Sequence, residues 1–270
     1  MSDQDTATTG QVTTSAAETY EAFFVPALFE QWSGPMLDRA GLSTGDDVLD
    51  VGCGTGVLAR AAAQRLGGSG SVTGVDINDG MLAVASNSAE PVSWRHGPAE
   101  RLPFPDRSFD RVVSQFALMF FVDQRAGITE MARVTRPGGS VTIATWASVD
   151  QSPGYAAMID LLHRLFGAEV AGALMAPFTL GSEDELREVI GETLPHARVV
   201  QHAGHARFDS LDAWIHTDVR GWTLADMISD DQHATLLEAA RTELSDFVMD
   251  DGQVRFAAPA LIASASTPPE

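Results

Sequence analysis

Three glycines alternate with other residues directly after a short apolar run. The run covers residues 48–51, and the glycines are Gly52, Gly54 and Gly56. Glycine allows a sharp turn and lets backbone N–H groups approach a ligand closely, and the start of a following helix favours a carboxylate or a phosphate. The spacing is G-x-G-x-G, whereas a dinucleotide-binding loop would have glycine or alanine where this chain has Val57. Alone, such a loop only weakly indicates which ligand it binds.

An acidic residue closes the next predicted strand, residues 71–76. This residue, Asp76, lies twenty positions after Gly56. At the end of a strand beside the glycine loop, a carboxylate can accept hydrogen bonds from both hydroxyl groups of a ribose. The loop and Asp76 together predict an adenosine derivative as the ligand.

Strand and helix patterns alternate around these residues, and we assign residues 46–147 to a cofactor-binding core. Runs of β-branched residues predict strands, and apolar residues at helical spacing predict helices. Their alternation implies right-handed crossovers and an α/β fold with a mostly parallel sheet and helices on both faces. The predicted strands are 47–52, 71–76, 92–96, 109–115 and 139–146, and the predicted helices are 57–66, 80–87 and 123–135.

The flanking segments complete one predicted domain, residues 18–270. Residues 1–17 are polar and rich in threonine, which predicts a flexible N-terminal arm. Residues 18–40 have helical spacing that is interrupted at Pro26 and at residues 33–35, which predicts two short helices. A helical block at 211–249 separates the last two predicted strands, 196–208 and 253–265, and we expect it to form a lid or a substrate-binding insertion.

Composition limits the partners. The chain has 37 acidic residues and 17 basic ones, all of them arginine, so its formal net charge is −20. The arginines are scattered singly, and we therefore expect no nucleic-acid partner, which would need a clustered basic face. No run of about 18 apolar residues occurs, so no membrane span is expected. One cysteine and a start without the features of a secretory signal point to a cytoplasmic location.

Four ordered blocks resemble the class I S-adenosylmethionine-dependent methyltransferases, in the small-molecule branch that includes the ubiquinone/menaquinone C-methyltransferases. The resemblance covers residues 48–146 and implies a Rossmann-like, seven-stranded methyltransferase fold whose last strand is antiparallel and follows a helical insertion. It also implies S-adenosyl-L-methionine as the cofactor. The four blocks are the glycine loop, residues 74–77 with 81–82, residues 99–110 and residues 130–139.

The same resemblance implies roles for individual residues. The cofactor's methionine moiety would be held by Asp50 and the three glycines, and its ribose by Asp76. The adenine would lie against Ile77 and Met81, with Ala99 and Glu100 at its edge, and Gln115 would face the methyl group. Many relatives have an acidic residue before the alanine, where this chain has Pro98; this departure concerns the adenine edge only.

Aromatic and apolar residues near the predicted strand ends are candidates for the acceptor pocket. The carboxyl ends of parallel strands are where such sheets bind ligands. Packing in the core is the simpler alternative for each of them. The candidates are Tyr20, Phe24 and Trp32 in the N-terminal helices, and Phe116, Met119 and Phe120 after the fourth core strand.

Among the histidines, His216 lies in the predicted insertion and could serve as a general base, although a packed or surface histidine is the commoner case. His202 and His205 are three residues apart on a predicted strand and would face opposite sides. We therefore expect no metal site.

The sequence thus favours methyl transfer from S-adenosylmethionine to a small, apolar or amphipathic molecule, with the acceptor atom left open. An NAD-dependent dehydrogenase is a second hypothesis, disfavoured by Val57 and by the lack of a dehydrogenase-like catalytic set. A third is a regulatory protein that binds the cofactor but no longer turns it over, since a cofactor site says nothing about turnover.

Overall fold

A seven-stranded sheet forms the centre of the computed structural model, which describes residues 13–220, 224 and 227–268. The strand order is β3-β2-β1-β4-β5-β9-β6, and only β9 runs antiparallel to its neighbours. This confirms the predicted mostly parallel sheet with an antiparallel last strand. The strands are β1 (Asp47–Val51), β2 (Ser71–Asp76), β3 (Val92–His96), β4 (Phe109–Gln115), β5 (Thr135–Trp146), β6 (Arg198–His202) and β9 (Ala260–Ser266).

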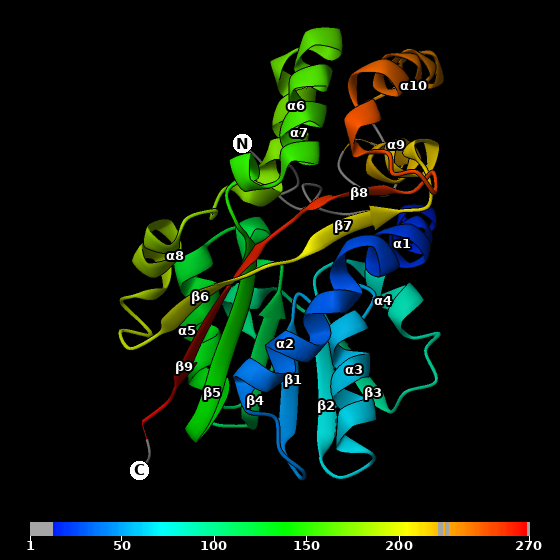
Figure 1. Cartoon of the computed structure of the whole chain (residues 1–270). Coiled ribbons are helices and arrows are strands. Elements are labelled where there is room, and N and C mark those ends of the chain that lie inside the picture. Colours follow the sequence, from blue (N-terminus) through cyan, green and yellow to red (C-terminus); the bar gives the residue numbers. More distant parts are fainter. Residues whose placement is uncertain (1–12, 221–223, 225–226, 269–270) are drawn as a thin grey trace, which may run out of the picture.

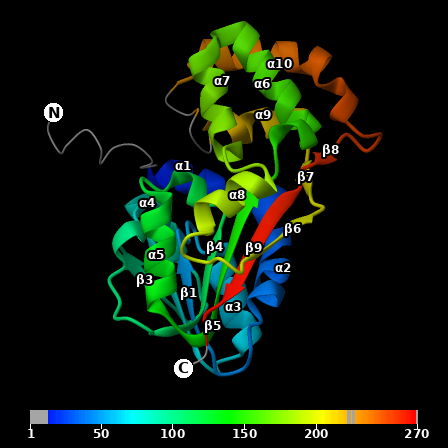
Figure 2. The ribbon, with the colours of Figure 1, turned by 90° about the vertical axis from the view of Figure 1, so that its left-hand side faces the viewer.

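Helices cover both faces of the sheet, as Figure 2 shows. Helices α2 (Glu30–Ala40) and α3 (Val57–Leu66) pack on one face, and α5 (Gln124–Val134) and α8 (Glu183–Ile190) on the other. Successive side chains of a strand point to opposite faces. Accordingly, Val48 belongs to the apolar cluster of the first face and Leu49 to that of the second. Helix α4 (Asp79–Ala85) follows β2.

The N-terminal segment forms one continuous helical run rather than the two short helices that we predicted. It comprises α1 (Thr14–Thr19), a π-helical segment η1 (Tyr20–Phe29) and α2, with Pro26 and Pro35 inside the helix. A proline removes a helical hydrogen bond, but this run buries an apolar stripe at every fourth residue, which offsets the loss. The stripe is Phe24, Leu28, Trp32 and Met36.

The predicted arm is also partly helical. Thr13 caps α1 through its side-chain oxygen, which accepts a hydrogen bond from the Ala16 N–H. Residues 14–17 therefore begin the helix, and residues 1–12 of the predicted arm lie outside the described residues.

Above the carboxyl ends of β4 and β5 stands a helical cap (Figures 1 and 2). It contains α6 (Pro153–Phe166), α7 (Ala168–Met175), η5 (Ala176–Phe178), α9 (Leu211–Arg220) and α10 (Asp230–Glu243). The first three of these elements precede the insertion that we predicted at 211–249, so two separate segments of the chain build the cap.

Two strands predicted as continuous are each divided in two. The chain leaves β6 and β9 to form a separate two-stranded ribbon, β7 (His205–Phe208) with β8 (Val254–Ala257), which leads to the cap helices (Figure 1). The break occurs at Gly204, where an added Cβ would lie 2.2 Å from the Trp32 ring. Close packing on a buried tryptophan thus directs the chain away from the main sheet.

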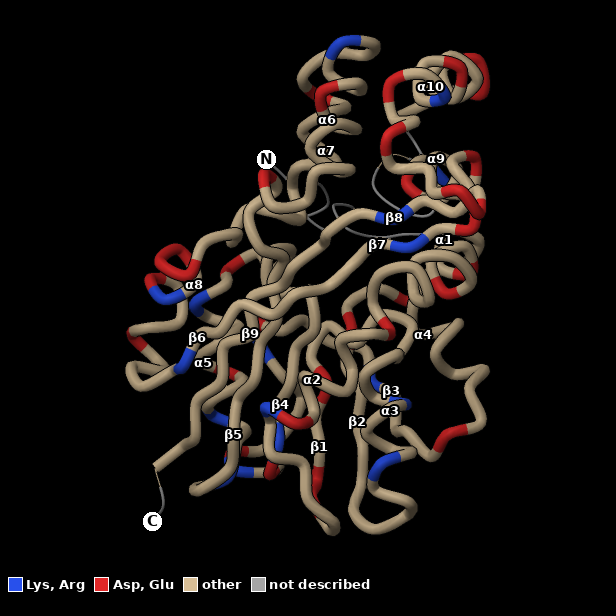
Figure 3. Tube along the Cα trace, in the orientation of Figure 1, with Lys and Arg blue, Asp and Glu red and all other residues tan. Residues whose placement is uncertain are grey.

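Charged residues are dispersed along the chain, and Figure 3 shows arginines on many separate elements. Several are paired with acids: Arg136 contacts both Asp47 and Asp110, at 2.9 and 2.6 Å. No helix within the described ranges combines the length and the apolar character needed to cross a bilayer.

Candidate active site

The glycine loop between β1 and α3 is held in a conformation that requires glycine. Gly52, Gly54 and Gly56 have φ values of 68°, 55° and 90°, in the left-handed region. The Gly52 N–H donates to the Val75 carbonyl at 2.8 Å, which ties the loop to β2. At Gly56 a Cβ would lie 2.3 Å from the Trp94 ring, whereas at Gly54 it would meet open space. The backbone of the loop is therefore accessible to a ligand at Gly54.

Asp76 ends β2 beside this loop, as predicted. Its two carboxylate oxygens accept hydrogen bonds from the Gly54 N–H at 2.7 Å and the Asn78 N–H at 2.8 Å. Burial raises the pKa of Asp76, and the backbone N–H groups oppose that effect. Since a carboxylate oxygen can accept more than one hydrogen bond, both oxygens retain capacity for the two hydroxyls of a ribose.

Asp50 provides a second carboxylate, from β1. It is 1% exposed, and one of its oxygens accepts a hydrogen bond from the Ala59 N–H at 3.1 Å. The other oxygen is buried and has no hydrogen-bond partner among the described residues. Burial, together with the charge of Asp76, raises the pKa of Asp50 to about 7. An acid in this setting is stabilised in its charged form by a nearby positive group, such as a cationic ligand.

The residues predicted around an adenine lie on the elements that follow β2 and β3. Ile77 is 48% exposed, and Met81 is buried in α4, where its N–H donates to Asn78 at 3.0 Å. Ala99 and Glu100 begin the short helix η2 (Ala99–Arg101). A carboxylate oxygen of Glu100 accepts a hydrogen bond from the N–H of Asp123, the N-cap of α5, at 3.2 Å. Glu100 therefore binds the start of α5, and it also lies at the edge of the predicted adenine site.

Gln115 ends β4 and connects the sheet to the N-terminal helix. Its amide N–H donates to the Phe29 carbonyl at 3.3 Å, while its amide oxygen is buried and has no partner in the described part of the chain. Phe29 is thus held over the carboxyl ends of the central strands.

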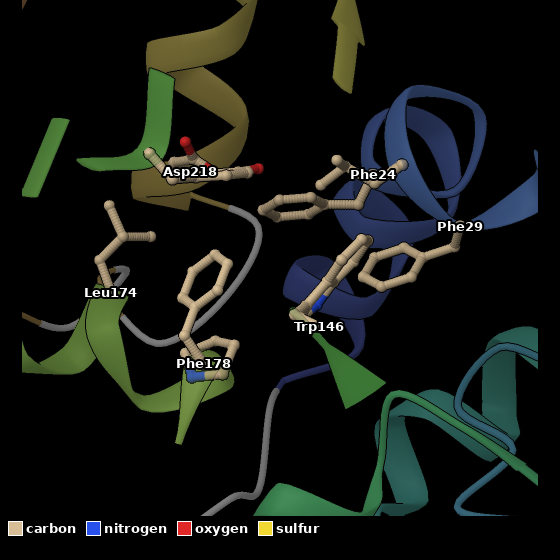
Figure 4. Close-up of a pocket in the computed structure, with 9 residues that line it drawn as sticks. Phe24, Phe29, Trp146, Leu174, Phe178 and Asp218 are labelled. Carbon is tan, nitrogen blue, oxygen red and sulfur yellow. The ribbon is translucent and has the colours of Figure 1, made fainter. Parts of the chain in front are cut away.

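A small, partly open pocket lies between Phe29 and the cap. Figure 4 shows aromatic side chains around it and one carboxylate, that of Asp218. Four parts of the chain contribute: η1, the end of β5, the cap segment 153–178 and α9. The residues that line the pocket are Phe24, Leu28, Phe29, Trp146, Tyr155, Leu174, Pro177, Phe178 and Asp218.

Tyr20 connects this pocket to the carboxylates. Its ring stacks on Phe29 with centroids 5.2 Å apart. Burial raises the pKa of Tyr20 well above its ordinary value, and the charges of Asp76, Glu21 and Asp50 add to the effect. Tyr20 therefore lies between the two carboxylates of the loop region and the aromatic pocket.

The other residues predicted for the acceptor pocket are placed differently. Phe24 lines it. Phe116 and Trp32 pack against Trp146, at centroid distances of 3.9 and 6.2 Å, and support the pocket wall from behind. Met119 packs against the apolar cluster of the first sheet face, and Phe120 is 41% exposed. Their contact with an acceptor stays a prediction.

His216 does not line the pocket in the structure. Its side chain is exposed, and its ring lies 6.0 Å from Phe23 and 6.3 Å from His233. The geometry therefore gives no support to its predicted role as a base. Sequence reasoning missed Asp218 on the same helix, although a signal was present: Leu211, Trp214, Ile215, Asp218 and Val219 follow one helical face, so an acid occupies an otherwise apolar stripe.

Comparison with known proteins supports the resemblance to methyltransferases that the four sequence blocks indicate. Residues 48–139 match the family model described as "Methyltransferase domain". The ubiquinone/menaquinone biosynthesis C-methyltransferase of Bordetella parapertussis is 39% identical over 134 residues, which are 47% of this chain and 52% of that protein. A demethylmenaquinone methyltransferase of Staphylococcus aureus is 40% identical over 119 residues, 42% of this chain and 49% of that protein. The chain spans about half the length of these curated relatives.

Solved structures extend the likeness of the fold to the whole chain. The phosphoethanolamine N-methyltransferase 2 of Haemonchus contortus, in complex with S-adenosyl-L-methionine, aligns over 100% of this chain and 60% of its own, with a TM-score of 0.62 and 21% identity. The chain therefore has the fold of the class I S-adenosylmethionine-dependent methyltransferases, matches a methyltransferase-domain model over residues 48–139, and resembles the ubiquinone/menaquinone C-methyltransferases.

Proposed function

We propose that the chain transfers a methyl group from S-adenosylmethionine to a small, apolar or amphipathic molecule. One observation carries the proposal: a glycine loop with two carboxylates, Asp50 and Asp76, is joined through Tyr20 to an aromatic pocket. Such an arrangement provides a site for a polar nucleoside beside a site for an apolar acceptor.

The residues present fit the cofactor. When bound, S-adenosylmethionine supplies a methyl group already activated by a positively charged sulfur. Asp76 would hold the ribose, and the unpartnered oxygen of Asp50 would accept a hydrogen bond from the positively charged amino group of the methionine moiety. The aromatic walls would exclude water and orient the acceptor, which is most of what an in-line displacement requires from a protein.

The acceptor that we propose is a planar aromatic molecule. In the described part of the chain, the pocket is lined by five aromatic side chains and three aliphatic ones, with a single charged group. The names of the curated relatives point in the same direction, because they refer to ubiquinone/menaquinone biosynthesis and to demethylmenaquinone. The single, buried cysteine fits a reducing compartment such as the cytoplasm. The dehydrogenase hypothesis is not favoured, since the family model and the relatives are methyltransferases.

Titration with S-adenosylhomocysteine and with NADH tests the cofactor assignment directly. We expect binding of S-adenosylhomocysteine, weakened about 10- to 100-fold by Asp76→Ala, because a hydrogen bond to a charged group contributes about 1.5–3 kcal/mol. Asp79→Ala is the matched control, since Asp79 is an exposed acid in the neighbouring helix α4. Binding of NADH alone would overturn the proposal. Incubation with labelled S-adenosylmethionine and 1,4-naphthohydroquinone then tests transfer, and cofactor binding without transfer to this or other aromatic acceptors would favour the regulatory protein.

A further inference from the structure

Among the described residues that line the aromatic pocket, Asp218 is the one that carries a charge. Its side chain comes from α9 and is 3% exposed. Neither of its carboxylate oxygens has a hydrogen-bond partner among the described residues. Figure 4 shows the carboxylate at the cap side of the pocket, across from Trp146 and Phe178.

Few polar groups surround this carboxylate. The hydroxyl of Tyr155 from α6 and the indole N–H of Trp214 from α9 are the described groups that act on it, and neither forms a hydrogen bond of standard geometry with it. The nearest arginine along the helix, Arg220, pairs with Asp230 instead. Burial therefore dominates, and it raises the pKa of Asp218 to about 8.

Burying an unpaired acid lowers the stability of the folded protein, and packing does not require an acid at this position. Leucine would fill the same space on the apolar face of α9 without that cost. Asp212, on the exposed side of the same helix, shows the ordinary alternative, because it pairs with Arg241 at 3.0 Å. A buried acid that points into a pocket without a protein partner is best explained by a group on the ligand.

We propose that Asp218 is the residue that binds a hydroxyl group on the aromatic acceptor and takes its proton. This inference rests on the proposed function and adds a substrate class to it, namely hydroxylated aromatic molecules. In the step, the O–H bond of the acceptor breaks, the proton passes to a carboxylate oxygen of Asp218, and the electron pair stays on the acceptor. The acceptor is thereby activated as a nucleophile, and the proton later leaves to solvent.

The small number of polar groups favours a hydroxyl over an ammonium group. An ammonium carries three N–H donors, whereas the lining residues that the structure describes offer two side-chain acceptors, the Asp218 carboxylate and the Tyr155 hydroxyl. A hydroxyl has a single donor, which Asp218 alone satisfies.

Binding measurements with three probes test this proposal. The probes are 1-naphthol, its blocked analogue 1-methoxynaphthalene, and 1-naphthylmethylamine, each titrated calorimetrically into protein saturated with S-adenosylhomocysteine. We expect 1-naphthol to bind about tenfold or more tightly than 1-methoxynaphthalene. Asp218→Leu should abolish this preference, and Asp212→Asn should retain it.

A second variant separates hydrogen bonding from proton acceptance. Asp218→Asn keeps the shape and an acceptor oxygen, so 1-naphthol should still bind. However, its affinity should no longer rise with pH through the range in which Asp218 of the natural chain ionises. Melting curves and S-adenosylhomocysteine affinity would reveal whether Asp218→Leu fails to fold. In that case Asp218→Asn still tests whether Asp218 accepts the proton.

Three results would overturn the proposal: equal affinity of the natural chain for 1-naphthol and 1-methoxynaphthalene, no binding of 1-naphthol, or a preference for 1-naphthylmethylamine that depends on Asp218. The last would assign the pocket to amines. Failure of the natural chain to bind S-adenosylhomocysteine would instead refute the proposed function, so the two failures are distinguishable.

Discussion

Replacing Asp218 by asparagine should stabilise the protein at neutral pH and leave its stability nearly unchanged near pH 4. Burial raises the pKa of the folded-state carboxyl from 3.8 to about 8. Between these values the folded state holds a proton that the unfolded state has released. The stabilising effect of that proton is complete below the unfolded-state pKa, decreases steadily as the pH rises above it, and is fully lost once the pH has passed the folded-state pKa. Asparagine is neutral throughout, so it avoids this loss.

The magnitude follows from the size of the shift. pH 7 lies about three units above the ordinary pKa of an aspartate, and each unit corresponds to about 1.36 kcal/mol. The expected gain in the free energy of unfolding is therefore about 4 kcal/mol at pH 7. For a domain of this size the melting temperature changes by about 2–4 °C per kcal/mol, so we expect an increase of roughly 8 °C or more.

Thermal unfolding of both proteins without ligand, followed by circular dichroism from pH 4 to pH 8, measures the difference. Taking the difference between the variant and the natural chain removes the contribution of other titrating groups, such as Asp50. Asp212→Asn is the control, because this exposed acid should give a small and pH-independent difference. A difference for Asp218→Asn that does not grow with pH, or a loss of stability at pH 7, would refute the assignment of a buried, unpaired acid.

Three further substitutions test other parts of the site. Asp50→Asn should weaken the binding of S-adenosylhomocysteine, whose amino group this carboxylate would hold, and remove the rise of that affinity above the Asp50 pKa of about 7, as measured by calorimetry at pH 6 and 8. Gly56→Ala should abolish cofactor binding and destabilise the fold by about 1–3 kcal/mol in melting curves, because the added Cβ would meet Trp94 at a positive φ. His216→Ala should leave methyl transfer unchanged, since its exposed ring lies outside the pocket; a large loss of rate would restore it as a base.

Local sequence patterns were sufficient to predict the elements of the cofactor-binding core. The glycine loop, Asp76 and the alternating strands were predictable because each depends on a few consecutive residues and because right-handed crossovers leave few arrangements of a parallel sheet. Helix α3, for example, has the predicted bounds, and its buried residues follow one helical face up to Gly67, which caps it.

Predictions failed where contacts between distant segments decided the outcome. Pro26 and Pro35 predict breaks, yet packing of the N-terminal stripe on the sheet keeps that helix continuous. The bend at Gly204 depends on Trp32, far away in the sequence. Likewise, the helical pattern of α9 includes both His216 and Asp218, and only the position of the cap shows which of them faces the pocket.

The sequence alone predicts an α/β fold and a nucleoside site at Asp76 from short-range patterns of glycine, acid and apolar residues, and the resemblance of its four ordered blocks predicts the methyltransferase fold. Only the tertiary structure shows that two separate cap segments meet the N-terminal helix around an aromatic pocket with one buried carboxylate. The physical reason is that burial, and with it the pKa and the chemistry of Asp218, depends on neighbours that are distant along the chain.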